Sequence, residues 1–106
     1  MARKTFDAVL LEAVDEALLT LGDSARQSIY FHLDKEFHVS RRDIPSRLKD
    51  FENGIDRIFG AGAKFLEILI MKRLFEKVGS PLLWDERKDL VFADYVMAAK
   101  QSMLSK

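Results

Sequence analysis

Apolar residues recur along most of the chain at the three- and four-residue spacing of amphipathic α-helices. The first stripe lies within residues 5–21, where Phe6, Leu10 and Val14 are four residues apart and Gly22 follows the last apolar position. Such a spacing places side chains on one face of a helix, and glycine commonly ends a helix. The pattern therefore predicts a first helix over residues 5–21.

Four further segments carry helical signals. We expect a second helix from about residue 23 to 37, a short turn at 40–43, a third helix from 45 or 46 to 59, and a last helix from about 90 to 105. The short turn should stop at Ile44, because a residue before proline disfavours the helical region. Gly54 costs the third helix about 1 kcal/mol relative to alanine, and close approach of a neighbouring helix is one reason for it.

The most apolar helix is predicted at residues 63–78. Five of the six residues from Phe65 to Ile70 are large and apolar, and at 100° per residue they cover more than half of the helix circumference. The segment is too short and too charged to cross a membrane. It should therefore be the central, most enclosed helix of a helical domain, with Leu66, Leu69 and Ile70 fully buried.

These elements predict an all-α fold, a compact multihelical single domain over residues 1–106 with five main helices around the central one. The chain is just long enough to bury one core, and 48% of its residues are hydrophobic. It has no cysteine, which excludes disulfides and thiolate metal sites. No signal-peptide core or membrane-spanning run is found, so we expect a soluble, cytoplasmic protein without membrane contact.

Candidate catalytic chemistry is sparse. The only histidines are His32 and His38, whose spacing matches no common metal-binding motif. No arrangement of nucleophile and base can be inferred from them. We therefore expect no catalytic residues, no metal site and no cofactor, and predict that the protein is not an enzyme.

The segment at 60–64 has two interpretations, an anion-binding site or a structural corner. Gly60, Gly62 and Lys64 stand at a helix start, where backbone amides and lysine can hold an anion, although a tight helix–helix corner is the favoured interpretation.

The segment 40–57 holds the only local excess of basic residues. Arg41, Arg42, Arg47 and Lys49 could contact a nucleic-acid backbone as in a helix-turn-helix protein. Intervening acidic residues and a net charge of zero favour a solvated charged face instead. A nucleic-acid-binding transcriptional regulator is therefore the alternative function, and nucleic acid is an unlikely partner.

Some apolar residues have no place on the helical stripes. Phe31 points away from the apolar face of its helix, and Leu82, Leu83 and Trp84 lie in a segment without helical periodicity. The segment at 82–84 either closes the core, which is slightly favoured, or joins Phe31 as a surface for a protein partner. This apolar load predicts self-association as a two-fold homodimer.

Four stretches of the sequence together resemble a known family. They are ALLTLGDSARQSIYFHL (17–33), FHVSRRDIP (37–45), FGAGAKFLEILIMKRLFEKVG (59–79) and FADYVMAAK (92–100). The chain resembles the archaeal Nitrosopumilus output domain family, and its most specific match is formed by Phe59, Gly60, Gly62, Ala63, Lys64, Leu66 and Glu67. The resemblance implies a stand-alone interaction or signalling output module with an unidentified protein partner, and no established activity or site residue to transfer.

Overall fold

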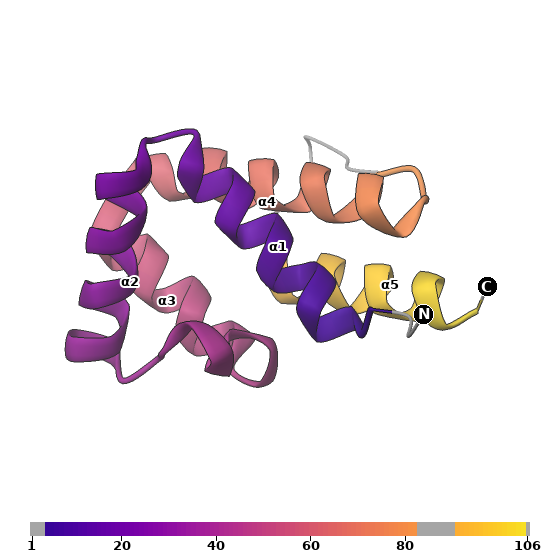
Figure 1. The fold of residues 1–106 in the computed structure, drawn as a ribbon, viewed down its shortest axis with the longest axis horizontal. Helices are drawn as coiled ribbons and strands as arrows, with labels where there is room; N and C mark the ends of the chain where they lie inside the picture. The colour runs from indigo at the N-terminus through magenta and orange to yellow at the C-terminus, as the bar shows by residue number, and fades with distance from the viewer. Residues whose placement is uncertain (1–3, 83–90, 106) are drawn as a thin grey trace.

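The computed structural model describes residues 4–82 and 91–105, and this part of the chain is helical throughout with tight connections (Figure 1). Its elements are α1 (Phe6–Leu19), α2 (Asp23–Phe37), the 3₁₀ helix η1 (Arg41–Ser46), α3 (Leu48–Phe59), the 3₁₀ helix η2 (Gly60–Gly62), α4 (Ala63–Val78) and α5 (Phe92–Leu104). The described residues include no strand. The predicted all-α fold with five main helices is confirmed.

The structure corrects one boundary that was predicted from proline. The turn that starts at Ser40 does not stop at Ile44 but continues through Pro45 as η1, and α3 begins at Leu48. The reciprocal hydrogen bonds of a capping box between Ser40 and Asp43 fix the first turn, as the sequence suggested. The fixed φ of proline is also the φ of a 3₁₀ helix, which explains why Pro45 is accommodated there.

Helix α4 packs against three other helices. Its most extensive contact is with α1, followed by α5, and it also contacts α3. Helix α2 packs on α1 and α3, and the α2–α3 pair lies to the left of α1 in Figure 1, with α5 to its right. The core therefore lies where α1 and α4 cross. None of the helices described is both long and apolar enough to span a membrane.

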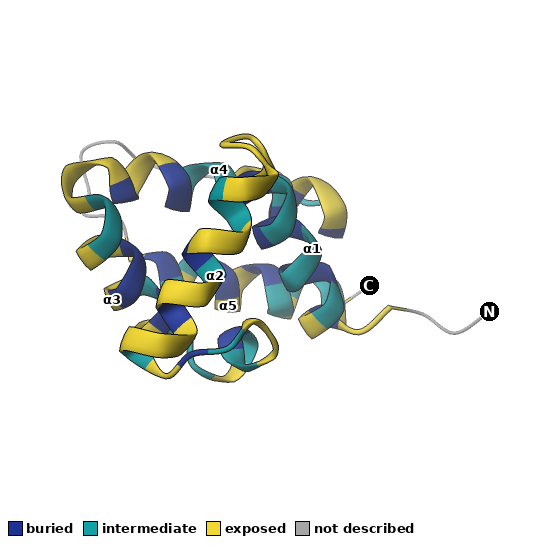
Figure 2. Ribbon diagram, turned by 60° about the vertical axis from the view of Figure 1, so that its left-hand side comes forward, coloured by how far each residue is buried: buried dark blue, intermediate teal, exposed yellow. Residues whose placement is uncertain are grey.

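Buried residues, dark blue on the ribbon in Figure 2, occur on each of the five α-helices, and their side chains form one cluster. The largest side chains with essentially no exposed surface are Phe51, Phe92, Leu10, Leu18, Leu33, Ile44, Ile55, Ile70, Met71, Leu74, Val14 and Val39. Half of the residues of α1 and half of those of α4 are buried, seven of 14 and eight of 16. These two helices thus contribute most of the core.

The prediction that Leu69 is fully buried was wrong. Leu66 and Ile70 are buried as expected, but Leu69 is only partly buried and Phe65 is 80% exposed. Helices α1, α3 and α5 cover only part of the circumference of α4, and the first two turns of its uncovered side carry Phe65 and Leu69. Helix α4 therefore has an apolar surface that its own chain leaves partly open.

The close approach suggested for Gly54 is confirmed. A Cβ atom built on Gly54 would lie 2.5 Å from Leu33 Cδ2 and 3.4 Å from the ring of Phe37. The missing side chain thus lets α2 pack directly on the backbone of α3. This contact offsets the lower helix propensity of glycine.

Replacing Ile70 by alanine should lower the free energy of unfolding by about 2–5 kcal/mol, because it removes a fully buried side chain from the α1–α4 contact. Lys72→Ala, at an exposed position of the same helix, should change it by less than about 0.5 kcal/mol. Urea unfolding followed by circular dichroism measures both. Equal losses for the two variants would show that α4 does not organise the core.

Candidate functional site

Of the predicted interface residues, the structure describes Phe31 and Leu82. Phe31 is 57% exposed on α2, with the Lys35 Nζ atom 5.4 Å from the ring centroid and the His32 ring edge-on to it. Leu82 is half-buried and packs against the core, which agrees with the favoured interpretation for that segment. Leu83 and Trp84 lie outside the described residues. Phe31 is thus an exposed aromatic side chain among polar neighbours.

An apolar groove that the sequence analysis missed lies at one end of α4. It encloses about 150 Å³ between the end of α1, the end of α3 and the start of α4. The residues that line it are Thr20, Leu21, Phe59, Gly62, Phe65, Leu66 and Leu69. Leu21 is 49% exposed and Phe65 forms the most exposed part of the lining. We call this surface the Phe65 groove.

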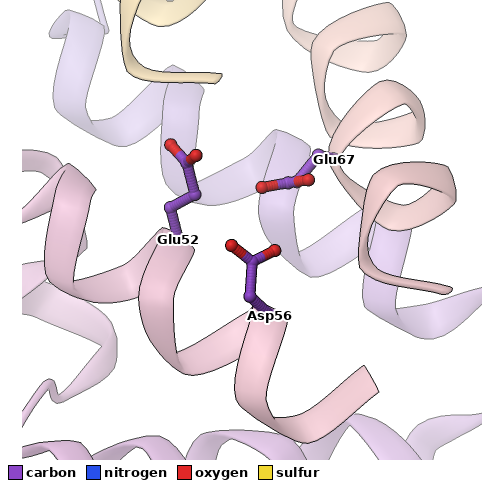
Figure 3. Close-up of side chains that lie close together, drawn as sticks. All are labelled: Glu52, Asp56 and Glu67. Carbon is purple, nitrogen blue, oxygen red and sulfur yellow. The ribbon is translucent and has the colours of Figure 1, made fainter. Parts of the chain in front are cut away.

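A cluster of three carboxylates lies at the contact of α3 with α4. Glu52 and Asp56 stand four residues apart on one face of α3, and Glu67 projects toward them from α4 (Figure 3). One carboxylate oxygen from each residue lies within 4.8 Å of the others. Glu67 is the only charged residue buried in the described part of the chain, with 4% of its surface exposed. We call these three residues the carboxylate cluster.

Burial and mutual repulsion raise the pKa values of two members of the cluster. Burial, followed by the charges of Asp56 and Glu52, raises the pKa of Glu67 from 4.5 to about 7, and Lys64 opposes this shift. Burial and the Asp56 charge also raise the pKa of Glu52, although the backbone N–H of Ala93 donates a hydrogen bond to it. Ionisation of Glu52 and Glu67 is therefore less favourable in the folded protein than in water.

The sequence carries a signal for this cluster in its acidic residues. The expectation that no metal site is present depends on histidine and cysteine, whereas oxygen sites need neither. Glu52 and Asp56 have the i, i+4 spacing that places both on one helix face. Glu67 interrupts the apolar run at 65–70, so a buried stripe had to include a carboxylate.

The basic candidates of the 40–57 segment are partly engaged within the protein. Arg41 forms a bidentate pair with Asp15 of α1, with Nε and Nη2 at 3.0 and 2.6 Å from the two carboxylate oxygens. Arg47 donates hydrogen bonds to Asp50 and to the carbonyl of His38. Their charges are thus already matched, in agreement with the favoured interpretation.

The remaining two basic candidates, Arg42 and Lys49, are exposed, and no ion pair of theirs is found in the described part of the chain. Two separate cations are a small electrostatic footprint for nucleic acid. The nucleic-acid interface therefore stays a prediction without structural support.

The Gly60–Lys64 segment forms the tight corner that was the favoured interpretation. Gly60 has φ +57°, which side-chain-bearing residues rarely adopt, and η2 leads directly into α4. Lys64 is exposed and lies close enough to Glu67 to lower its pKa. An anion at Gly60, Gly62 and Lys64 would share this lysine with the carboxylate cluster, so the anion site stays a prediction.

Comparisons of the chain with protein-family models, with curated proteins and with solved structures gave no significant match. The resemblance to the Nitrosopumilus output domain family is therefore neither supported nor opposed by them. The candidate functional features of the described residues are the Phe65 groove and the carboxylate cluster.

Replacing Glu67 by glutamine should stabilise the metal-free protein at pH 8 and leave its stability nearly unchanged at pH 4. Folding raises the pKa of Glu67 from 4.5 to about 7. The free energy of unfolding of the wild-type protein therefore falls as the pH rises from about 4.5 to about 7. Glutamine is not ionised, so its advantage above pH 7 should be on the order of 2–3 kcal/mol.

Urea unfolding in a chelator-containing buffer at both pH values measures this difference. Glu76→Gln is the matched control, because it makes the same substitution at an exposed position of α4 outside the carboxylate cluster. An advantage of Glu67→Gln that is the same at pH 4 and pH 8 would contradict the assignment.

Proposed function

We propose that the protein is a non-catalytic protein–protein interaction module that assembles as a two-fold homodimer through the Phe65 groove. The observation that carries the proposal is the 80% exposed side chain of Phe65 beside an apolar groove. A large exposed apolar side chain next to an apolar recess is typical of a surface that is covered by a partner.

A second copy of the chain is the occupant that this surface fits best. A two-fold interface uses the same patch on both subunits, so the patch must offer both a projecting group and a recess. The Phe65 groove offers both, since Phe65 projects at its edge and Leu21, Leu66 and Leu69 line it. In a two-fold arrangement each Phe65 enters the groove of the other subunit.

The charge of the chain favours this pairing. Seventeen basic residues balance seventeen acidic ones, so two copies carry no net charge that would repel each other. The non-catalytic part of the proposal rests on the two histidines. Both are exposed, and His32 pairs with Glu36 across one turn of α2. A signalling output role is the extension of this proposal that the family resemblance implies.

Size-exclusion chromatography with light scattering tests the proposal. Wild type at tens of micromolar should have twice the 12.2 kDa mass of one chain. Phe65→Asp should have the mass of one chain, because it places two like charges across the two-fold axis. The helix tolerates this change, since an acidic residue in the first turn interacts favourably with the helix dipole. Circular dichroism should show unchanged helix content.

Phe31→Asp is the matched control, because it removes an equally large exposed ring from α2 and should leave the dimer intact. A wild-type mass of 12.2 kDa at 100 µM protein would refute the homodimer. A dimer that Phe31→Asp dissociates and Phe65→Asp does not would place the interface on α2 instead.

A further inference from the structure

The strongest unexplained feature of the molecule is the Glu67 side chain. It is 4% exposed, and no hydrogen bond or ion pair to its carboxylate is found in the described part of the chain. A buried carboxylate without a partner is costly, because it loses most of its hydration and no protein group replaces it. Exposed acidic residues occur in many proteins without a ligand, but a buried, unpartnered one requires an explanation.

The Glu67 side chain is also directed toward two other carboxylates. Figure 3 shows its carboxylate turned from α4 toward Glu52 and Asp56 on α3, so that the three groups face a common centre. Like charges facing one another repel, and an i, i+4 pair of carboxylates on one helix already destabilises it. Lys64 lies close enough to Glu67 to lower its pKa, but the two residues form no ion pair.

We propose that Glu52, Asp56 and Glu67 bind a divalent cation, and that the ion is calcium. A cation at the common centre gives Glu67 the partner that the described residues do not provide, and it converts the repulsion among three carboxylates into attraction. The donor set consists of carboxylate oxygens alone, which hard cations prefer and which zinc or copper sites rarely use.

The irregular arrangement of the donors favours calcium over magnesium. The three oxygens lie within 4.8 Å of one another, so one cation can contact all of them. Magnesium requires near-ideal octahedral geometry at about 2.1 Å and keeps several waters, whereas calcium binds oxygen at about 2.4 Å in flexible geometry. Calcium also accepts the irregular arrangement that two carboxylates from α3 and one from α4 provide.

Access and coordination number are consistent with this assignment. Asp56 is exposed and Glu52 half-buried, so the ion can enter from the side of α3 while Glu67 holds it from the interior. Three carboxylates provide between three and six oxygens, and water on the exposed side of Asp56 supplies the rest of the six to eight ligands of calcium. The bound ion would join α3 to α4 beyond the Gly60 corner.

Isothermal titration of the chelator-treated protein with calcium chloride tests the inference. We expect one ion per chain with a Kd on the order of 10⁻⁵–10⁻³ M, and weaker binding of magnesium chloride. Calcium at ten times its Kd should raise the Tm by about 4 °C or more, measured against potassium chloride of equal ionic strength.

Three variants locate the site. Glu67→Gln should fold, since it removes a buried charge, and should weaken calcium binding about tenfold or more. Asp56→Asn, at an exposed position, should weaken it as well without affecting the core. Glu76→Gln, at an exposed position of the same helix, should bind calcium as wild type does.

Absence of saturable heat up to 10 mM calcium would overturn the inference, as would equal binding by wild type and Glu67→Gln. Magnesium binding as tight as calcium binding would overturn the choice of ion. The result does not depend on the proposed dimer, because Phe65 and Glu67 are two residues apart and point about 200° apart around α4. A monomeric protein that binds calcium would refute the Phe65 groove interface and uphold this site.

Discussion

The packing of α4 against α1 is the contact on which the rest of the structure depends. Both helices bury half of their residues, and their shared interface is the most extensive one in the molecule. Because α5 and α3 also pack on α4, its orientation is fixed on three sides. This fixed orientation determines where the two unusual residues of its first turns point. Phe65 points outward at the groove, and Glu67 points inward at α3.

The corner at Gly60 brings the carboxylates together. Helices α3 and α4 are separated only by η2, so the chain changes direction within three residues, and Gly60 adopts a positive φ there. So short a connection forces the end of α3 to lie beside the start of α4. Asp56 and Glu67 are therefore neighbours because of the turn. The same corner brings Phe59 and Phe65 to the two sides of one groove.

The helices could be predicted from the sequence because each depends on local patterns. Apolar spacing and the glycines at 22, 60 and 79 gave the helix order and most boundaries within a few residues. The uncovered side of α4 could not be predicted, because a helix with apolar residues all round does not indicate how many neighbours it has. The carboxylate cluster depends on the corner geometry as well. Its only local trace is a glutamate within the run at 65–70.

Net charge does not indicate where the binding sites of this protein lie, because some charged side chains form ion pairs and others do not. The chain carries equal numbers of acidic and basic residues, yet Arg41 and Arg47 form ion pairs with Asp15 and Asp50, while Glu67 has no such partner among residues 4–82 and 91–105. Balanced totals therefore coexist with a local excess of negative charge between α3 and α4. A basic run such as 40–49 indicates little when two of its three arginines, Arg41 and Arg47, already form ion pairs within the protein. The charges that indicate a binding site are those that folding buries without a partner, because a bound ion or ligand can then provide the missing partner.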